Sequence, residues 1–144
     1  MRAIVELAQF SDPEAAEWLI TCLIKRRDRV GDFYFRQVLP LEGFRIESGA
    51  FKFEHLGQKH SLFEAPPIRF GRSTFDNSSE THAPIPGAAD SAQLPDAVRA
   101  GADSYYAVRL AGDNPEKTVT VYLRKTAGSY EVAGVDRTFP LIKR

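Results

Sequence analysis

The chain of 144 residues carries 19 Lys and Arg against 19 Asp and Glu, and 43% of its residues are hydrophobic. This length suits one domain, or a small helical piece joined to a β domain. The zero net charge argues against a nucleic-acid binder, which usually has a basic excess. The single cysteine, Cys22, excludes an internal disulfide framework and a cysteine-based zinc site. No apolar run is long enough to span a membrane.

The first residues lack the apolar core and cleavage site of a signal peptide. If Met1 is the natural start, we therefore expect a cytoplasmic protein. However, Ala3, Ile4 and Leu7 recur at helical spacing with no capping residue before them. A helix that lacks its N-terminal cap favours a second interpretation, in which the sequence is a fragment of a longer chain. In that case the protein could also be extracytoplasmic.

A long helix is predicted to begin near residue 11. Ser11-Asp12-Pro13-Glu14 has the pattern of a capping box, in which Ser11 accepts a hydrogen bond from the amide of Glu14. We expect this helix to end near Val38, ahead of Pro40. Together with residues 3–10 it would form a helical hairpin. At 100° per residue its apolar side chains share one face: Ala15, Ala16, Leu19, Cys22, Leu23, Val30, Phe33 and Tyr34.

Arg26 lies near the middle of this apolar stripe. It either extends past its apolar stem to reach water, or is buried and needs a carboxylate partner elsewhere in the chain. The charge run from Lys25 to Arg29 is interrupted by Asp28 and is typical of a solvated helix face.

The stretch Asp12-Pro13-Glu14-Ala15-Ala16, followed by Leu23-Ile24-Lys25-Arg26-Arg27-Asp28, resembles a segment in the C-terminal part of long, uncharacterised bacterial proteins. The resemblance covers about 30 residues. It implies that the chain is the tail of a larger polypeptide, and it implies no activity.

After Pro40 the hydrophobic period changes from helical to two, which is typical of strands. Phe44 and Ile46 precede the turn at residues 48–50, and Phe51 and Phe53 follow it, which predicts a hairpin. Further strands are expected at 68–75 and 82–85. The final three are expected at 105–110, 118–125 and 130–137.

The register of the final three strands follows from matching their apolar faces. Leu110 is expected beside Val119, Val108 beside Val121 and Tyr106 beside Leu123. Across the next turn the pairs are Lys125 with Tyr130, Arg124 with Glu131, Leu123 with Val132, Val121 with Gly134, and Val119 with Asp136. Asp136 thus ends an aliphatic row, either at the rim of the sheet or as a buried acid for which Arg26 is a candidate partner.

These elements predict an α+β protein. Residues 1–40 form a helix or helical hairpin packed on an antiparallel sheet or sandwich of about six or seven strands, made by residues 41–144. We expect the helix to cover the aliphatic face of the final three strands. A cone-like fold of the nuclear-transport-factor kind is the alternative. The segment from Asp76 to Ser104 contains one expected short helix, at 95–100, and is either a functional loop or one laid across the sheet.

Catalytic and metal-binding motifs are absent from the sequence. His55, His60 and His82 lack the spacing of metal ligands, and Cys22 lies on the apolar stripe. No nucleophile elbow, phosphate loop or dinucleotide fingerprint occurs, so we expect neither a metal nor a cofactor.

Candidate binding residues lie on the polar side of the last sheet. Tyr105, Tyr122, Arg109 and Arg124 share that face, with Tyr105 beside Arg124, a composition that suits an interface or stacking on a sugar ring. We therefore favour a non-catalytic interaction or accessory domain, whose partner is another domain of the same polypeptide, a protein or a carbohydrate. The alternatives are a ligand-binding or hydrolytic pocket between helix and sheet bearing Arg26, His55 and Asp136, and a homo-oligomer formed through the Tyr/Arg face.

Overall fold

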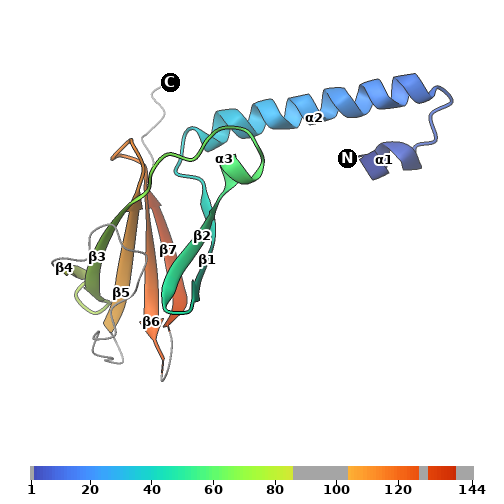
Figure 1. Ribbon diagram of the computed structural model, residues 1–144. Helices are drawn as coiled ribbons and strands as arrows, with labels where there is room; N and C mark the ends of the chain where they lie inside the picture. The colour runs from blue at the N-terminus through green and yellow to red at the C-terminus, as the bar shows by residue number, and fades with distance from the viewer. Residues whose placement is uncertain (1, 86–103, 127–129, 139–144) are drawn as a thin grey trace.

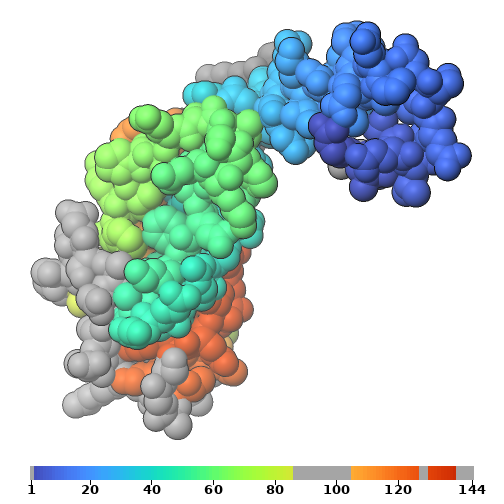
Figure 2. Space-filling model, turned by 45° about the vertical axis from the view of Figure 1, so that its right-hand side comes forward, coloured from blue at the N-terminus to red at the C-terminus, as the bar shows by residue number. Residues whose placement is uncertain are grey.

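The computed structural model describes residues 2–85, 104–126 and 130–138. A body of strands carries a long helix that projects away from it (Figures 1 and 2). The short helix expected at residues 95–100 and much of the segment from Asp76 to Ser104 lie outside the described residues.

The projecting part, which we call the helical arm, consists of α1 (Arg2–Leu7) and α2 (Pro13–Phe35). Asp12 caps α2 by accepting hydrogen bonds from the amides of Glu14 (2.9 Å) and Ala15 (3.3 Å). The predicted cap at Ser11 is therefore displaced by one residue, because the carboxylate of Asp12 already accepts from the free amides. α2 also ends at Phe35, earlier than the expected Val38.

The strand body contains two antiparallel sheets. One pairs β1 (Leu41–Glu47) with β2 (Ala50–His55). The other has the order β4-β3-β5-β6-β7, and the short helix α3 (Leu56–Lys59) follows β2. The bounds of the five strands are Arg69–Asp76 for β3, Thr81–Pro84 for β4, Ser104–Ala111 for β5, Thr118–Lys125 for β6 and Tyr130–Thr138 for β7. The predicted α+β class with antiparallel sheets is confirmed.

The predicted register of β5 and β6 is confirmed at every pair: Tyr106 with Leu123, Val108 with Val121, and Leu110 with Val119. Between β6 and β7 it holds only from Lys125 and Tyr130 as far as Leu123 and Val132.

A bulge between Tyr122 and Leu123 shifts the rest of the β6–β7 ladder by one residue. Val121 therefore faces Val135, Tyr122 faces Gly134, and Thr120 faces Asp136. The predicted pairs of Val121 with Gly134 and of Val119 with Asp136 are wrong, because one extra residue in a strand moves every later side chain to the opposite face.

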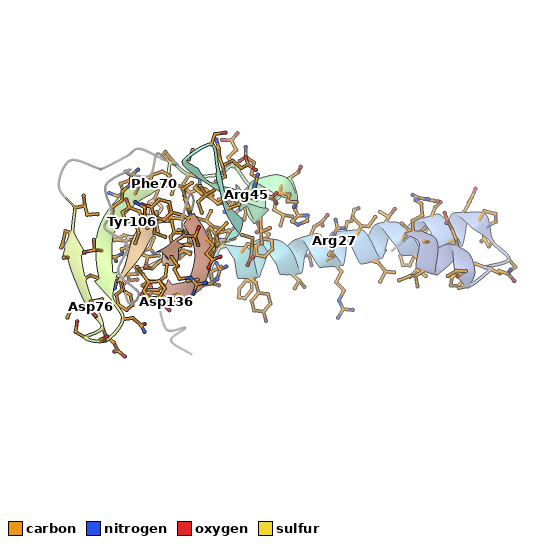
Figure 3. The ribbon with its side chains drawn as sticks, turned by 90° about the horizontal axis from the view of Figure 1, so that it is seen from below. Arg27, Arg45, Phe70, Asp76, Tyr106 and Asp136 are labelled. Atoms are coloured by element: carbon orange, nitrogen blue, oxygen red, sulfur yellow. The ribbon has the colours of Figure 1, made fainter. Side chains whose placement is uncertain are left out.

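The aliphatic face of the five-stranded sheet is covered by the β1–β2 hairpin (Figure 1). Leu41 and Phe51 from the hairpin join Val108, Val121 and Leu123 in one buried cluster. The helix does not form this cover as expected: α2 contacts chiefly α1 and α3, and it meets the body at its C-terminal end. In Figure 3 the side chains converge between the strands, whereas Arg27 and its neighbours on α2 project into open space.

Local contacts shape the hairpin and tie it to the sheet. Ser48 and Gly49 have φ of 51° and 75°, and a tight two-residue hairpin turn favours such left-handed conformations at both central positions. The guanidinium of Arg137 on β7 donates to the carbonyl of Leu41 at 2.9 Å and pairs with Glu42 at 2.9 Å. The hairpin is thus anchored along the free edge of β7.

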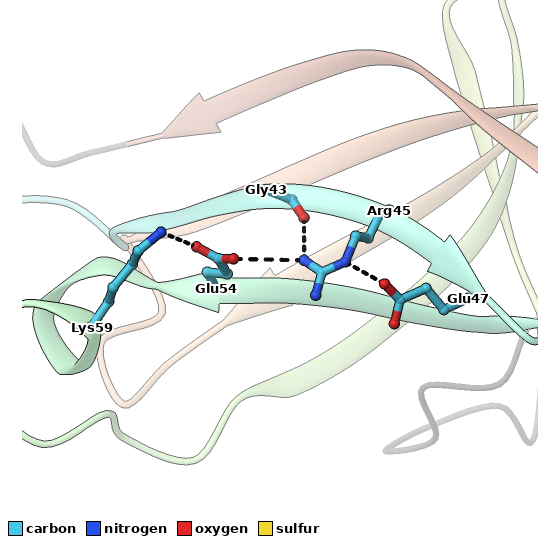
Figure 4. Close-up of polar contacts among 5 residues, drawn as sticks. All are labelled: Gly43, Arg45, Glu47, Glu54 and Lys59. Carbon is cyan, nitrogen blue, oxygen red and sulfur yellow. Dashed lines mark hydrogen bonds and ion pairs between the residues drawn. The ribbon is translucent and has the colours of Figure 1, made fainter.

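A chain of charges runs along the outer surface of the hairpin (Figure 4). Arg45 donates to Glu47 at 2.7 Å and to the carbonyl of Gly43 at 3.0 Å, and lies 3.9 Å from Glu54. Lys59 reaches Glu54 at 2.5 Å from α3, and this hydrogen bond lowers the pKa of the Glu54 carboxyl. These groups are exposed, so the network contributes little to stability.

Candidate functional site

The candidate site is the side of the five-stranded sheet that faces away from the β1–β2 hairpin, which we call the outer face. Side chains alternate along a strand, so the burial of Tyr106, Val108 and Leu110 places Tyr105 and Arg109 on this outer face. On β6 the burial of Val119, Val121 and Leu123 similarly places the intervening side chains there: Thr120, Tyr122 and Arg124.

Four aromatic rings gather on the outer face. Phe75 of β3 lies 4.8 Å from Tyr122, 4.7 Å from His82 and 6.5 Å from Tyr105, measured between ring centroids. His82 of β4 is held by a contact of 3.0 Å between its Nδ1 and the hydroxyl of Ser73. We call Phe75, His82, Tyr105 and Tyr122 the aromatic platform. It crosses β4, β3, β5 and β6, and its rings, tilted by 39–54° where they contact Phe75, are brought together by this strand order.

A hollow lies on each side of the platform, and Tyr122 borders both. The larger, with a cavity volume of about 650 Å³, contains Arg109, Asp136, Thr120 and the Ser73 hydroxyl among its lining groups. The smaller, of about 330 Å³, is bounded by Tyr105, Tyr122 and the bare Gly134. Gly134 keeps this hollow open, because a Cβ there would stand 3.8 Å from the Tyr122 ring. The outer face is therefore an aromatic surface with a hollow on each side, and the larger hollow contains charged and hydroxyl groups.

The charges on this face are of both signs. Partial burial raises the pKa of the Tyr122 hydroxyl, and the nearby carboxylate of Asp136 raises it further. Tyr122 therefore stays a neutral hydrogen-bonding group at physiological pH. Arg124 is engaged by Glu131 at 2.8 Å, the cross-strand pair expected from the sequence, and this hydrogen bond raises the pKa of its guanidinium. Arg109 is exposed and has no ion pair within the described part of the chain.

His55 lies apart from the outer face and has a structural role. It caps α3, its Nδ1 accepting a hydrogen bond from the amide of Gln58 at 3.3 Å, and its ring packs edge-on against Phe63 at 5.7 Å. Because Nδ1 accepts, the proton of the neutral ring is on Nε2, which is buried without a hydrogen-bond partner among the described residues. Burial lowers the pKa of His55.

The pocket expected between helix and sheet is formed only in part. A cavity of about 380 Å³ lies where the end of α2 meets the body, and His55, Phe35 and Phe63 line it. Arg26 and Asp136 do not reach it: Arg26 is exposed on the arm, and Asp136 is exposed on the outer face. The predicted buried pair of Arg26 and Asp136 is therefore wrong, because the bulge turns Asp136 outward and α2 projects away from the sheet.

Phe75 and His82 are outer-face residues that sequence reasoning missed as site residues, and Asp136 was expected on the opposite, aliphatic face. His82 lies on β4, where a strand was expected at 82–85, and it pairs with Phe75. Whether Phe75 and Tyr105 lie on the same face of the sheet depends on which strands are neighbours. The sequence alone does not give this strand order. Within the described ranges no group of three or more His, Cys, Asp or Glu side chains could hold a metal ion.

Comparison with known proteins found no matching family model, no matching curated protein and no matching solved structure. Among the described residues, no helix has both the length and the apolar character needed to cross a membrane.

Proposed function

We propose that the chain is a non-catalytic binding module and that its outer face binds carbohydrate. The observation that carries this proposal is the aromatic platform with a hollow on each side, the larger of which contains charged and hydroxyl groups. A sugar ring has an apolar face of C–H groups and a rim of hydroxyls, so it needs a flat aromatic surface and planar hydrogen-bonding groups together.

The individual groups fit these two needs. Tyr122 lies between the two hollows and is only partly buried, so its ring is placed to stack on a sugar. Arg109 and Asp136 supply charged donors and acceptors in the larger hollow, and Thr120 adds a hydroxyl between them on β6. Hydrogen bonds to charged groups are stronger than those between neutral ones, which favours a hydroxyl-rich ligand.

The resemblance of residues 12–28 to a segment of long bacterial proteins supports an accessory role within a larger polypeptide. In such a chain the module would hold a glycan near another domain. Other domains of the same polypeptide are then its expected neighbours.

A glycan array followed by calorimetric titration of the best-binding oligosaccharide tests this proposal. We expect Tyr122→Ala to weaken binding at least about tenfold, or by about 1.4 kcal/mol, through loss of stacking. Arg109→Ala should weaken binding through lost hydrogen bonds while leaving the fold intact, because Arg109 is exposed.

The matched control is Tyr34→Ala, which removes an exposed tyrosine from α2 and should leave glycan affinity unchanged. An array on which no glycan binds would contradict the proposal. Binding that survives both Tyr122→Ala and Arg109→Ala would also contradict it, because the glycan would then occupy another surface.

A further inference from the structure

The helical arm presents apolar side chains that nothing in the described structure covers. Trp18, Phe33 and Tyr34 are 69%, 55% and 61% exposed, and Leu23 and Val30 are exposed as well. Contiguous exposed apolar surface of this kind marks an interaction site. Figure 2 shows the arm extending away from the body.

Part of this exposed surface lies on a different side of α2 from its more buried positions. At 100° per residue, Ile20, which is buried, Gly31, which lies beside Leu62, and Phe35, which stacks on His60, fall on one side. Leu23, Val30 and Phe33 fall on another side, with Trp18 and Tyr34 at its two edges. α2 therefore has two apolar sides, of which the structure buries only one.

The exposed side has the spacing of a helix-pairing seam. Ala16, Leu19, Leu23, Arg26, Val30 and Phe33 follow one another at alternating intervals of three and four residues. We call these six positions the outer seam. With 23 residues α2 is about 35 Å long, enough for three heptads.

Charge along the arm is divided between its two halves. Residues 2–17 contain four carboxylates and one arginine, a net charge of −3, whereas residues 25–36 contain five cations and two carboxylates, a net charge of +3. Within the described part of the chain, Lys25, Arg26 and Arg29 have no ion-pair partner. The arm is thus electrically complementary to a reversed copy of itself, and it repels a copy that runs parallel.

We propose that the outer seam binds the same seam of a second copy of this chain, with the two α2 helices antiparallel. A two-fold axis near the middle of α2 places Ala16 opposite Phe33 of the second copy and Leu19 opposite Val30. The small Ala16 then faces the large Phe33, and each contact is made twice, as a closed two-fold interface requires. Leu23 faces Arg26 near the axis.

Arg26 sets the register of this interface. Its apolar stem packs beside Leu23 of the second copy while the guanidinium reaches the edge of the seam. A single polar residue in an apolar seam disfavours other registers, because each shift would bury the charge against a different apolar neighbour. The residue that breaks the apolar stripe in the sequence thus has a role in selecting the partner.

Sedimentation equilibrium of the full chain tests association. We expect a species of twice the 16.1 kDa chain mass that dissociates on dilution and weakens as salt rises, because opposite charges face each other. Val30→Glu should weaken the dimer at least about 100-fold without changing the unfolding of the strand body. Ile4→Glu, the same kind of change at an exposed site on α1, is the matched control and should leave the dimer intact.

Disulfide trapping tests the antiparallel direction. In a Cys22→Ser background, Leu19→Cys mixed with Val30→Cys should form a cross-linked dimer under mild oxidation, whereas Leu19→Cys alone should not. A chain that stays monomeric at every concentration overturns the proposal. Cross-linking of Leu19→Cys with itself overturns the antiparallel arrangement. Binding of a monomeric chain to vesicles containing phosphatidylserine would assign the seam to a membrane surface and also overturn it.

Discussion

The strand body and the helical arm differ in how much their side chains depend on tertiary contacts. In the body, strands distant in sequence supply one buried cluster, and Leu41, Leu110, Val121 and Leu123 are fully shielded from water. In the arm, Val5 and Ile20 are the hydrophobic residues that become buried among those described. A helix satisfies its own backbone hydrogen bonds, whereas a strand needs neighbours. The arm can therefore keep its regular structure with one apolar side still uncovered.

The largest expected effect on stability comes from replacing one leucine by alanine in each region. Leu110→Ala empties a fully buried position and should lower the free energy of unfolding by about 2–5 kcal/mol. Leu7→Ala on α1, where the side chain is 83% exposed, should change it by less than about 0.5 kcal/mol. Urea unfolding measures both, and equal losses would show that the arm is packed like the core.

Replacing two glycines by alanine sharpens the comparison, because the two changes are expected to alter stability in opposite directions. A Cβ at Gly57 in α3 would approach the Phe63 ring to 2.5 Å, so Gly57→Ala should destabilise the fold by about 1–3 kcal/mol. A Cβ at Gly31 in α2 would meet only the tip of Leu62, at 3.2 Å. Gly31→Ala should therefore stabilise by about 0.5 kcal/mol through better helix propensity. Thermal unfolding of both variants measures the signs, and a stabilised Gly57→Ala would contradict the packing of α3.

The cap of α2 tests whether the arm unfolds independently of the body. Asp12→Ala removes two hydrogen bonds to backbone amides and should cost the first turn of α2 about 1 kcal/mol. Amide hydrogen exchange should become faster there and stay unchanged in β6. Asp12→Asn retains the acceptor and is the control. Faster exchange throughout the body would show that arm and body unfold as one unit.

The smallest expected effect is a pH dependence of the body. Burial keeps the pKa of His55 below its usual 6.5, so between the two values the unfolded chain binds more protons than the folded one. Stability contributed by neutral His55 is therefore present above about pH 6.5 and falls as the pH drops through this window. Urea unfolding at several pH values should show this slope, and His55→Asn, which retains a capping oxygen, should reduce it. His60→Asn, at an exposed ring, controls for the loss of an imidazole.

Much of the strand pairing in the body was predictable because it depends on residues that are close together in the sequence. The pairs of β5 with β6 follow from matching apolar faces across one turn, and Arg124 opposite Glu131 follows from the next. The bulge after Tyr122 was not predictable from the sequence. The shifted ladder places Val135 beside Val121, and the unshifted ladder would place Gly134 there. Either residue is tolerated beside Val121, so matching apolar faces does not choose between the two ladders. The β7 part of the candidate site depended on that bulge, since it turns Asp136 to the outer face.

The sequence by itself determined the approximate positions of α2 and of the strands, the pairing of the final strands near their turns and the outward parity of Tyr105, Arg109 and Tyr122. These features depend on periodicity and turn chemistry, which act over a few residues. Only the tertiary structure decided that the hairpin of β1 and β2 covers the aliphatic face, that β3 and β4 bring Phe75 and His82 beside Tyr122, and that α2 stays apart. Several apolar surfaces in this chain could have covered the same sheet face, and the choice among them depends on shape over the whole molecule.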